Sequence, residues 1–384
     1  MKVRAACALL LLLLAGCSTV GDVYDRWFGS QPAAKPAPLP PVQNSAAARI
    51  LWQANVGAAE RAVFFPAVTG DVVYATGAAG RISGFDTRTG KQVVSINVGQ
   101  PLSGGVGANG TTILVGTGKG EVFAFDASGK QLWKAQLSGE VLAPPAIEGT
   151  LVAVRTGDGR IYGFDIADGK RRWVYQRTTP ALSLRSHSGL VFERGAIFAG
   201  FAGGRLVALT ASTGTVGWDS VVALPRGTTE LERVADVSGL PNVDGDRVCA
   251  VAYQGRAACF DAQSGSTIWA RDLSSSAGLD ADHRSVYITD DKNAVIALDK
   301  ATGASLWKQE KLSGRGVSAP LAFGRYVIVG DFQGYVHVLS REDGSFVTRV
   351  ATDGSAIGAP PVALDMSSFV VQTRNGGLFA VAIQ

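Results

Sequence analysis

Apolar and polar residues alternate in short runs along most of this chain, and turns that contain glycine separate the runs. Alternation with a period of two is typical of antiparallel strands, and no stretch beyond the first residues shows a convincing helical period. The pattern recurs in seven full copies, the clearest of which are GEVFAFDASGKQLW, GRIYGFDIADGKRRW and GRAACFDAQSGSTIW. An eighth copy, GGLFAVAIQ, stands at the end of the sequence. A repeated unit of strands predicts an all-β repeat fold.

The spacing of the copies indicates the architecture. One apolar anchor per copy recurs every 38 to 51 residues, at Phe85, Phe125, Phe164, Leu209, Phe260, Leu298, Leu339 and Val381. Four-stranded propeller blades repeat every 40 residues or so, and we therefore predict an eight-bladed β-propeller of antiparallel blades over residues 49–384. The eighth copy lacks a last strand, and residues 48–53 carry the missing pattern. We expect the two ends to pair and close the ring, which removes exposed sheet edges.

Aspartate and tryptophan repeat with the copies and could suggest an active site. The aspartates, each just before a turn that contains glycine, are Asp86, Asp126, Asp165, Asp261 and Asp299. An Asp at such a turn accepts backbone N–H bonds, so we interpret the set as structural. The tryptophans that end the copies are Trp52, Trp133, Trp173, Trp218, Trp269 and Trp307, with Val94 and Phe346 in two other copies. We expect these side chains to pack between blades.

The first residues form a secretory signal. Lys2 and Arg4 precede a short apolar run, and small residues lead to Cys17. The stretch LAGC at residues 14–17 resembles the bacterial lipobox, which implies cleavage after residue 16 and acylation of Cys17. Ser18 follows, whereas an Asp there resembles an inner-membrane retention signal, so we expect a lipid anchor at the periplasmic face of the outer membrane. Residues 17–48 are rich in Pro and Ala and predict a semi-rigid tether.

Charge and cysteine content narrow the function classes. The formal charge of +4 falls to +2 when residues 1–16 are removed, because Lys2 and Arg4 go with them. So small a charge does not predict nucleic-acid binding. Cys249 and Cys259 are the cysteines left after Cys17, and they flank a predicted hairpin turn. A cross-strand disulfide is possible, but strand cysteines are more often small buried apolar residues, and we favour two free thiols.

No catalytic, cofactor-binding or metal-binding residue is predicted. The three histidines lie in different copies, and the mature chain contains no CxxC, HExxH or GxSxG motif. The repeat resembles the blades of quinoprotein dehydrogenases, which hold pyrroloquinoline quinone on a vicinal cysteine pair. This chain has no adjacent cysteines and lacks the length of their cofactor-covering loops. We expect no cofactor and no enzyme, with a periplasmic quinoprotein dehydrogenase or a small-ligand-binding propeller as the alternative.

Taken together, the lipobox, the Pro-rich tether, the eight blades and the segment GDFQGY at residues 330–335 resemble the BamB family. Its members are β-propeller lipoproteins of the outer-membrane β-barrel assembly (BAM) complex. The resemblance implies a non-catalytic scaffold that acts as a monomer within a hetero-oligomeric complex. It also implies two partners: the polypeptide-transport-associated domains of BamA, and unfolded outer-membrane proteins.

Two of the predicted connections between blades are long, at residues 176–189 and 221–243. They occupy the same point of neighbouring copies, so we expect them side by side on one face, where binding sites often lie. The candidate partner-binding residues are Leu182, Leu184, Arg185, Glu230, Arg233 and Asp236, accompanied by Leu231 and Glu232. Apolar residues beside an Arg and carboxylates suit an interface. Alternatively, Leu182 and Leu184 are buried in their own blade.

The resemblance assigns part of this set directly. In the BamB family the segment that corresponds to Leu182–Arg185 contacts BamA, and Asp236 matches one of two family aspartates. Ser238 stands where the family has the second aspartate, which leaves one contact in doubt.

Overall fold

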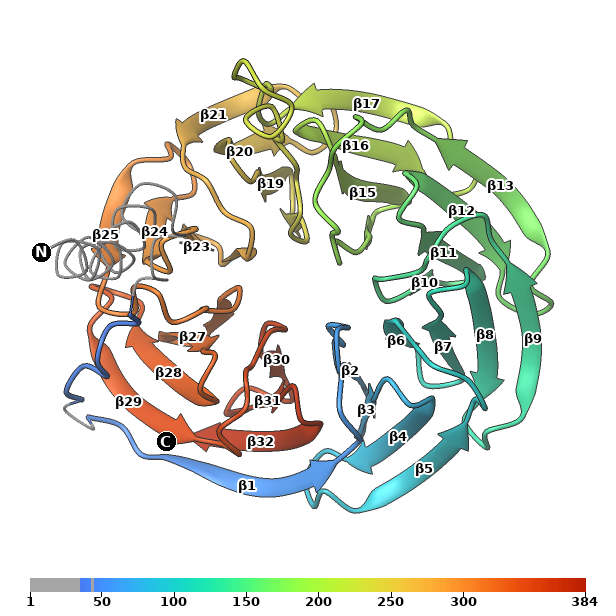
Figure 1. Ribbon diagram of the computed structural model, residues 1–384, viewed down its shortest axis with the longest axis horizontal. Helices are drawn as coiled ribbons and strands as arrows, with labels where there is room; N and C mark the ends of the chain where they lie inside the picture. The colour runs from blue at the N-terminus through green and yellow to red at the C-terminus, as the bar shows by residue number, and fades with distance from the viewer. Residues whose placement is uncertain (1–34, 43–44) are drawn as a thin grey trace, which may run out of the picture. The chain divides into compact units, whose positions relative to one another are not determined.

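The computed structural model describes residues 35–42 and 45–384, and the strands within them form eight four-stranded antiparallel sheets. Figure 1 shows the sheets as blades around a ring. The propeller is therefore confirmed. Among the described residues, no helix is both long and apolar enough to cross a membrane.

Each blade runs from an inner to an outer strand. The first four blades comprise β2 (Ala67–Thr69), β3 (Val72–Thr76), β4 (Arg81–Asp86), β5 (Gln92–Asn97); β6 (Gly104–Ala108), β7 (Thr112–Gly116), β8 (Glu121–Asp126), β9 (Gln131–Gln136); β10 (Ala146–Glu148), β11 (Leu151–Arg155), β12 (Arg160–Asp165), β13 (Arg171–Gln176); and β14 (Val191–Glu193), β15 (Ala196–Phe201), β16 (Arg205–Thr210), β17 (Val216–Val221). The next three comprise β18 (Asn242–Asp244), β19 (Arg247–Val251), β20 (Arg256–Asp261), β21 (Thr267–Asp272); β22 (Gly278–Ala281), β23 (Ser285–Thr289), β24 (Val295–Asp299), β25 (Ser305–Gln309); and β26 (Leu321–Phe323), β27 (Tyr326–Gly330), β28 (Tyr335–Ser340), β29 (Phe346–Ala351). The closing blade comprises β30 (Val362–Ala363), β31 (Ser368–Gln372), β32 (Gly377–Ile383) and β1 (Ala48–Asn55).

The closing blade joins the two ends of the propeller as predicted. Strand β1 pairs antiparallel with β32, with Ala48 opposite Ile383 and Trp52 opposite Ala380. The anchors lie on the third strand of each blade and are buried, because the second and third strands are covered by neighbouring blades on both faces. The sequence pattern therefore identified the most buried strand of every blade.

The tryptophans on the outer strands join neighbouring blades. Each indole N–H donates to a backbone carbonyl of the next blade at 2.7 to 3.0 Å. Glycine at the facing turn is required for this contact: a Cβ on Gly90 would lie 2.7 Å from the Trp52 ring, and Gly90 has φ +69°. The expected packing between blades is confirmed.

The repeated aspartates hold turns, as expected. The Asp126 carboxylate accepts the backbone N–H groups of Ser128 and Lys130 at 2.9 and 3.0 Å, and Asp299 does the same for its own turn. Hydrogen bonds lower the pKa of all five carboxyls: from a neighbouring hydroxyl and backbone groups in four of them, and from the Arg172 guanidinium and a backbone group at Asp165. Each side chain faces its own turn and not a shared cavity.

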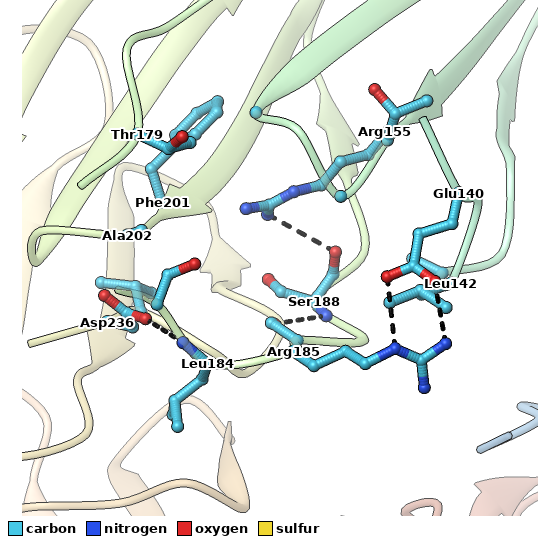
Figure 2. A pocket seen from close by; sticks show the side chains of 17 residues that line it. Glu140, Leu142, Arg155, Thr179, Leu184, Arg185, Ser188, Phe201, Ala202 and Asp236 are labelled. Carbon is cyan, nitrogen blue, oxygen red and sulfur yellow. Dashed lines mark hydrogen bonds and ion pairs between the residues drawn. The ribbon is translucent and has the colours of Figure 1, made fainter. Parts of the chain in front are cut away.

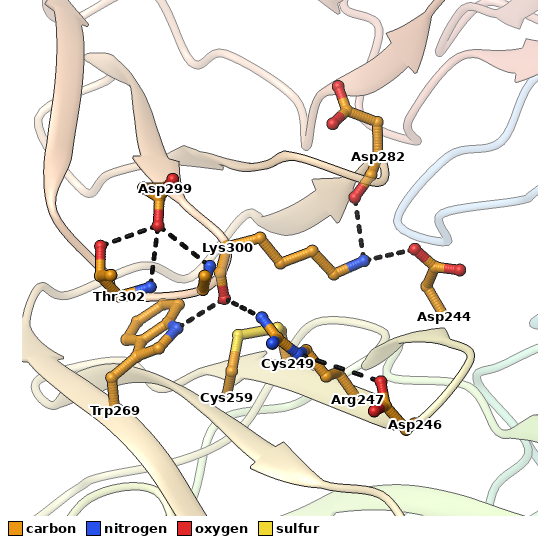
Figure 3. Close-up of a disulfide and its surroundings, with 11 residues drawn as sticks. Asp244, Asp246, Arg247, Cys249, Cys259, Trp269, Asp282, Asp299, Lys300 and Thr302 are labelled. Atoms are coloured by element: carbon orange, nitrogen blue, oxygen red, sulfur yellow. Dashed lines mark hydrogen bonds and ion pairs between the residues drawn. A yellow bond between two sulfur atoms is a disulfide. The ribbon is translucent and has the colours of Figure 1, made fainter.

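Cys249 and Cys259 are bonded as a disulfide, so the favoured expectation of two free thiols is wrong. The two residues are directly opposite on β19 and β20, which brings their Cα atoms to 4.1 Å. Figure 3 shows the bond near Trp269, whose indole donates to the Lys300 carbonyl of the next blade at 2.9 Å. Sequence could not decide this point because a register one residue away would have pointed the two thiols to opposite faces.

Part of the expected tether belongs to the propeller. The backbone N–H of Ala37 donates to the Ser313 carbonyl at 2.9 Å, and Arg315 donates to the Ala37 carbonyl at 3.0 Å. Ser45 bonds to the Val347 carbonyl at 3.1 Å. Ala37, Pro40 and Ser45 thus contact the blade of β26–β29 or the connection that leads into it, which shortens the expected tether. The expected signal peptide and Cys17 lie outside the described residues.

Candidate functional site

The two long connections lie side by side, as predicted. The first joins β13 to β14 and the second joins β17 to β18. The hydroxyl of Ser186 donates to the Ser238 carbonyl at 3.0 Å, and that of Ser188 donates to the Gly239 carbonyl at 2.9 Å. We call these two connections the docking loops. Hydrogen bonds link residues 184–188 of the first loop to residues 236–239 of the second, so the two loops are joined there rather than independent.

Asp236 holds the docking loops together from inside. Its side chain is only 3% exposed. One carboxylate oxygen accepts the backbone N–H of Leu184 at 2.6 Å, and the other accepts that of Gly203 at 3.0 Å. A buried carboxylate whose two oxygens are both used does not suit the exposed contact that the sequence suggested. The structure gives Asp236 a positioning role, because it fixes the backbone beside Arg185.

The leucines of the first docking loop differ in exposure. Leu182 is 43% exposed, while Leu184 is partly buried. The alternative that both leucines are buried in their own blade is therefore wrong for Leu182. On the second docking loop Leu231 is 73% exposed, and Glu230 and Arg233 are exposed beside it. Glu232, in contrast, accepts the backbone N–H groups of Thr228 and Thr229, which lower the pKa of its carboxyl.

Arg185 is exposed, but it is paired within the chain. Its guanidinium donates to both oxygens of Glu140, at 3.2 and 2.9 Å. Glu140 lies in the connection between β9 and β10 and was not among the sequence candidates. The pair raises the pKa of Arg185. Because both side chains are more than a third exposed to water, the pair orients Arg185 without adding much stability.

A cavity of about 280 Å³ lies beneath the docking loops. Figure 2 shows the Arg155 guanidinium among the lining residues, while Arg185 points away toward Glu140. Arg155 ends β11, and its Cζ atom lies 4.9 Å from the centre of the buried Phe201 ring. Sequence analysis missed Arg155. A comparison between the copies could have identified Arg155, because the other seven blades have an uncharged residue at the corresponding position of the second strand. These residues are Thr76, Gly116, Gly200, Val251, Thr289, Gly330 and Gln372.

A comparison with protein families decides the assignment. The family described as "Outer membrane protein assembly factor BamB" matches residues 78–309 and 302–384. The chain belongs to the BamB family.

Relatives from several bacteria agree with this assignment along the whole chain. The outer membrane protein assembly factor BamB of Burkholderia pseudomallei is 42% identical over 375 residues, which cover 97% of this chain and 96% of the relative. The BamB of Nitrosomonas eutropha is 43% identical and covers 99% of this chain, with 95% of the relative covered. That of Escherichia coli is 33% identical, with 97% of each chain covered.

Solved structures separate family from fold. BamB from Moraxella catarrhalis superposes with a TM-score of 0.81 at 28% identity, over 88% of this chain and 100% of the other. The quinohemoprotein alcohol dehydrogenase of Comamonas testosteroni gives a TM-score of 0.72 at only 13% identity, over 88% of this chain and 77% of the other. The second likeness shows the propeller fold alone. The full-length relatives are named as BamB assembly factors, which favours that function over the dehydrogenase alternative.

Proposed function

We propose that this chain is a non-catalytic scaffold of the BAM complex, which assists the folding and insertion of outer-membrane proteins. Membership of the BamB family supports the complex, and the docking loops support the binding site. The observation that carries the site is a surface on which Leu182 is exposed and Arg185, three residues on, is oriented by Glu140. An exposed apolar side chain on a backbone fixed by hydrogen bonds loses little conformational entropy when a partner covers it.

The chemistry of the docking loops suits a folded protein partner. Leu182 and Leu231 are exposed apolar residues of the docking loops, and Glu230, Arg233 and Arg185 are charged residues exposed on the same loops. An apolar centre with a charged rim is the usual composition of a protein interface. We propose that the partner is the polypeptide-transport-associated region of BamA, with Leu182, Leu184 and Arg185 in contact and Asp236 as their support. Unfolded outer-membrane proteins are the proposed clients.

The position of residue 37 bears on the proposed lipid anchor at Cys17. Ala37 contacts Ser313, which lies in the connection from the outer strand β25 to the inner strand β26. The docking loops are connections of the same type, and in a ring of antiparallel blades all such connections emerge on one face. Ala37 therefore lies on the face that carries the docking loops. We propose anchoring at the periplasmic face of the outer membrane, with the partner bound on this same face.

A detergent pull-down of the acylated protein from its native membrane tests the proposal. Arg185→Glu places a negative charge beside Glu140 and should abolish recovery of a large outer-membrane barrel protein. Arg88→Glu is the matched control, because Arg88 is exposed on the hairpin between β4 and β5, at the opposite end of the blades. Equal recovery with both variants, or recovery of no barrel protein by the unmodified chain, would contradict the proposal.

A further inference from the structure

The cavity under the docking loops contains two residues that depart from the repeat. Arg155 replaces an uncharged residue, as described above. Phe201 is the second departure, because the corresponding residues of the other blades are Gly77, Thr117, Thr156, Ala252, Asp290, Asp331 and Thr373. The two unusual side chains come from neighbouring blades and meet, with the guanidinium over the ring. A flat cation on an aromatic ring is held in orientation without the use of its N–H donors.

Most of the Arg155 donors have no partner within the described residues. A guanidinium carries five N–H groups. The contact from Arg155 to the Ser188 carbonyl is long, at 3.5 Å, and among the described residues the only charge that acts on Arg155 is that of Asp236, with no hydrogen bond between the two. Burial lowers the pKa of Arg155 to about 10, against an opposing effect of the Asp236 charge, so the group remains cationic at neutral pH. Figure 2 shows the free end of the guanidinium directed among the cavity residues.

The two acidic residues of the cavity already have donors. Glu140 accepts both of its hydrogen bonds from Arg185. Asp236 accepts the backbone N–H groups of Leu184 and Gly203. Neither carboxylate therefore accepts a hydrogen bond from Arg155. The planar Arg155 guanidinium can donate two parallel hydrogen bonds to the two oxygens of one further carboxylate.

We propose that this cavity binds a single carboxylate of a polypeptide. The carboxylate would accept hydrogen bonds from the Arg155 guanidinium, which the Phe201 ring holds in place. The cavity opens between residues of the docking loops, including Thr179 and Ser183, which are exposed. Its size of about 280 Å³ suits one acidic side chain or one chain end rather than a larger ligand. The negative charges of Asp236 and Glu140 nearby disfavour a doubly charged phosphate. The proposal does not rest on the proposed function, because every residue of the cavity belongs to this chain.

Titration of the full mature chain in detergent, labelled with ¹⁵N-arginine, tests this site. The probes are acetyl-Gly-Glu-Gly-amide, its Gln counterpart, and acetyl-Gly-Ala-Gly with a free carboxyl end, all at one ionic strength. We expect the Nε–H signal of Arg155, assigned from its loss in Arg155→Lys, to shift saturably with one or both acidic probes and not with the Gln peptide. The acidic probe that binds identifies the source as a side chain or a chain end.

Two variants separate this site from the docking surface. Arg155→Met should abolish the shift of the remaining arginine signals that the acidic probe causes. Leu182→Ala, at an exposed residue that does not line the cavity, should keep the Arg155 shift while recovery of the barrel-protein partner falls. Equal shifts with the Glu and Gln peptides would overturn the proposal. A larger shift with inorganic phosphate would also overturn it. An Arg155 signal that does not shift with either acidic probe would do the same, because Arg155 would then be only a fixed counter-charge to Asp236. If Arg155→Met fails to fold, the Glu and Gln peptides on the unmodified chain still decide.

Discussion

Replacement of Asp236 by Ala should loosen the docking loops without removing any exposed contact. The change deletes a buried carboxylate that accepts two backbone N–H groups, at 2.6 and 3.0 Å. A hydrogen bond to a charged group contributes roughly 1.5–3 kcal/mol, and a buried donor left unpaired is costly. We therefore expect a loss of about 3–5 kcal/mol in the stability of the closed loop arrangement. Asp236→Asn keeps one acceptor oxygen and should lose about half as much.

Hydrogen exchange of the Leu184 and Gly203 amides measures this effect locally. In the native chain these amides should exchange slowly, because both donate to a buried acceptor. Asp236→Ala should accelerate both by at least tenfold, while amides of the distant strand β27 stay protected. Partner recovery should also fall, although no exposed residue has changed. If the exchange rate of the Leu184 amide is unchanged in Asp236→Ala, the positioning role of Asp236 is refuted. If partner recovery nevertheless falls in that variant, Asp236 contacts the partner directly.

Three further predictions concern stability and the oriented arginine. The double variant Cys249→Ser with Cys259→Ser should have a free energy of unfolding about 2–3 kcal/mol lower, measured with denaturant, because that is the chain-entropy contribution of a cross-link that closes so short a loop. A reducing agent should destabilise the unmodified chain and have no effect on the variant. Glu140→Gln removes the carboxylate that pairs with Arg185. The variant should bind the partner protein a few-fold more weakly, with its free energy of unfolding unchanged within about 0.5 kcal/mol. A full loss of binding would mean that Glu140 itself contacts the partner protein. Because the turn aspartates have pKa values lowered from 3.8, they stabilise the fold above that pH, and their contribution is lost as the pH falls further through the lowered values. An acid titration followed by circular dichroism should show a smaller loss below pH 3.8 for Asp126→Asn than for the unmodified chain.

The ring could be predicted because its signals are local and repeated. The alternation around each anchor, such as Phe125 or Phe260, identified a buried strand without knowledge of its neighbours. Ring closure followed because the eighth copy lacked a strand that residues 48–53 could supply, and β1 does pair with β32. The positions of the docking loops followed from their length and from their place at the same point of neighbouring copies.

The side-chain roles could not be predicted because they depend on contacts between distant residues. Asp236 bonds to the backbone of Leu184, which is 52 residues away, and Arg185 pairs with Glu140, which is 45 residues away. No local pattern distinguishes an aspartate that faces solvent from one that accepts two backbone N–H groups inside a loop. The contact of residue 37 with Ser313 likewise joins residues that are far apart in the sequence, and a Pro-rich composition alone predicted a free tether.

Site-specific photo-cross-linking in cells tests the central claim most directly. A photoreactive residue at Leu182 or Leu231 should form cross-links to one outer-membrane barrel protein of the assembly machinery, because both side chains are exposed on the docking loops. The same residue at Arg88, at the opposite end of the blades, should form none to that protein. Cross-links from Arg88 but not from Leu182 and Leu231 would place the partner on the other face and contradict the account.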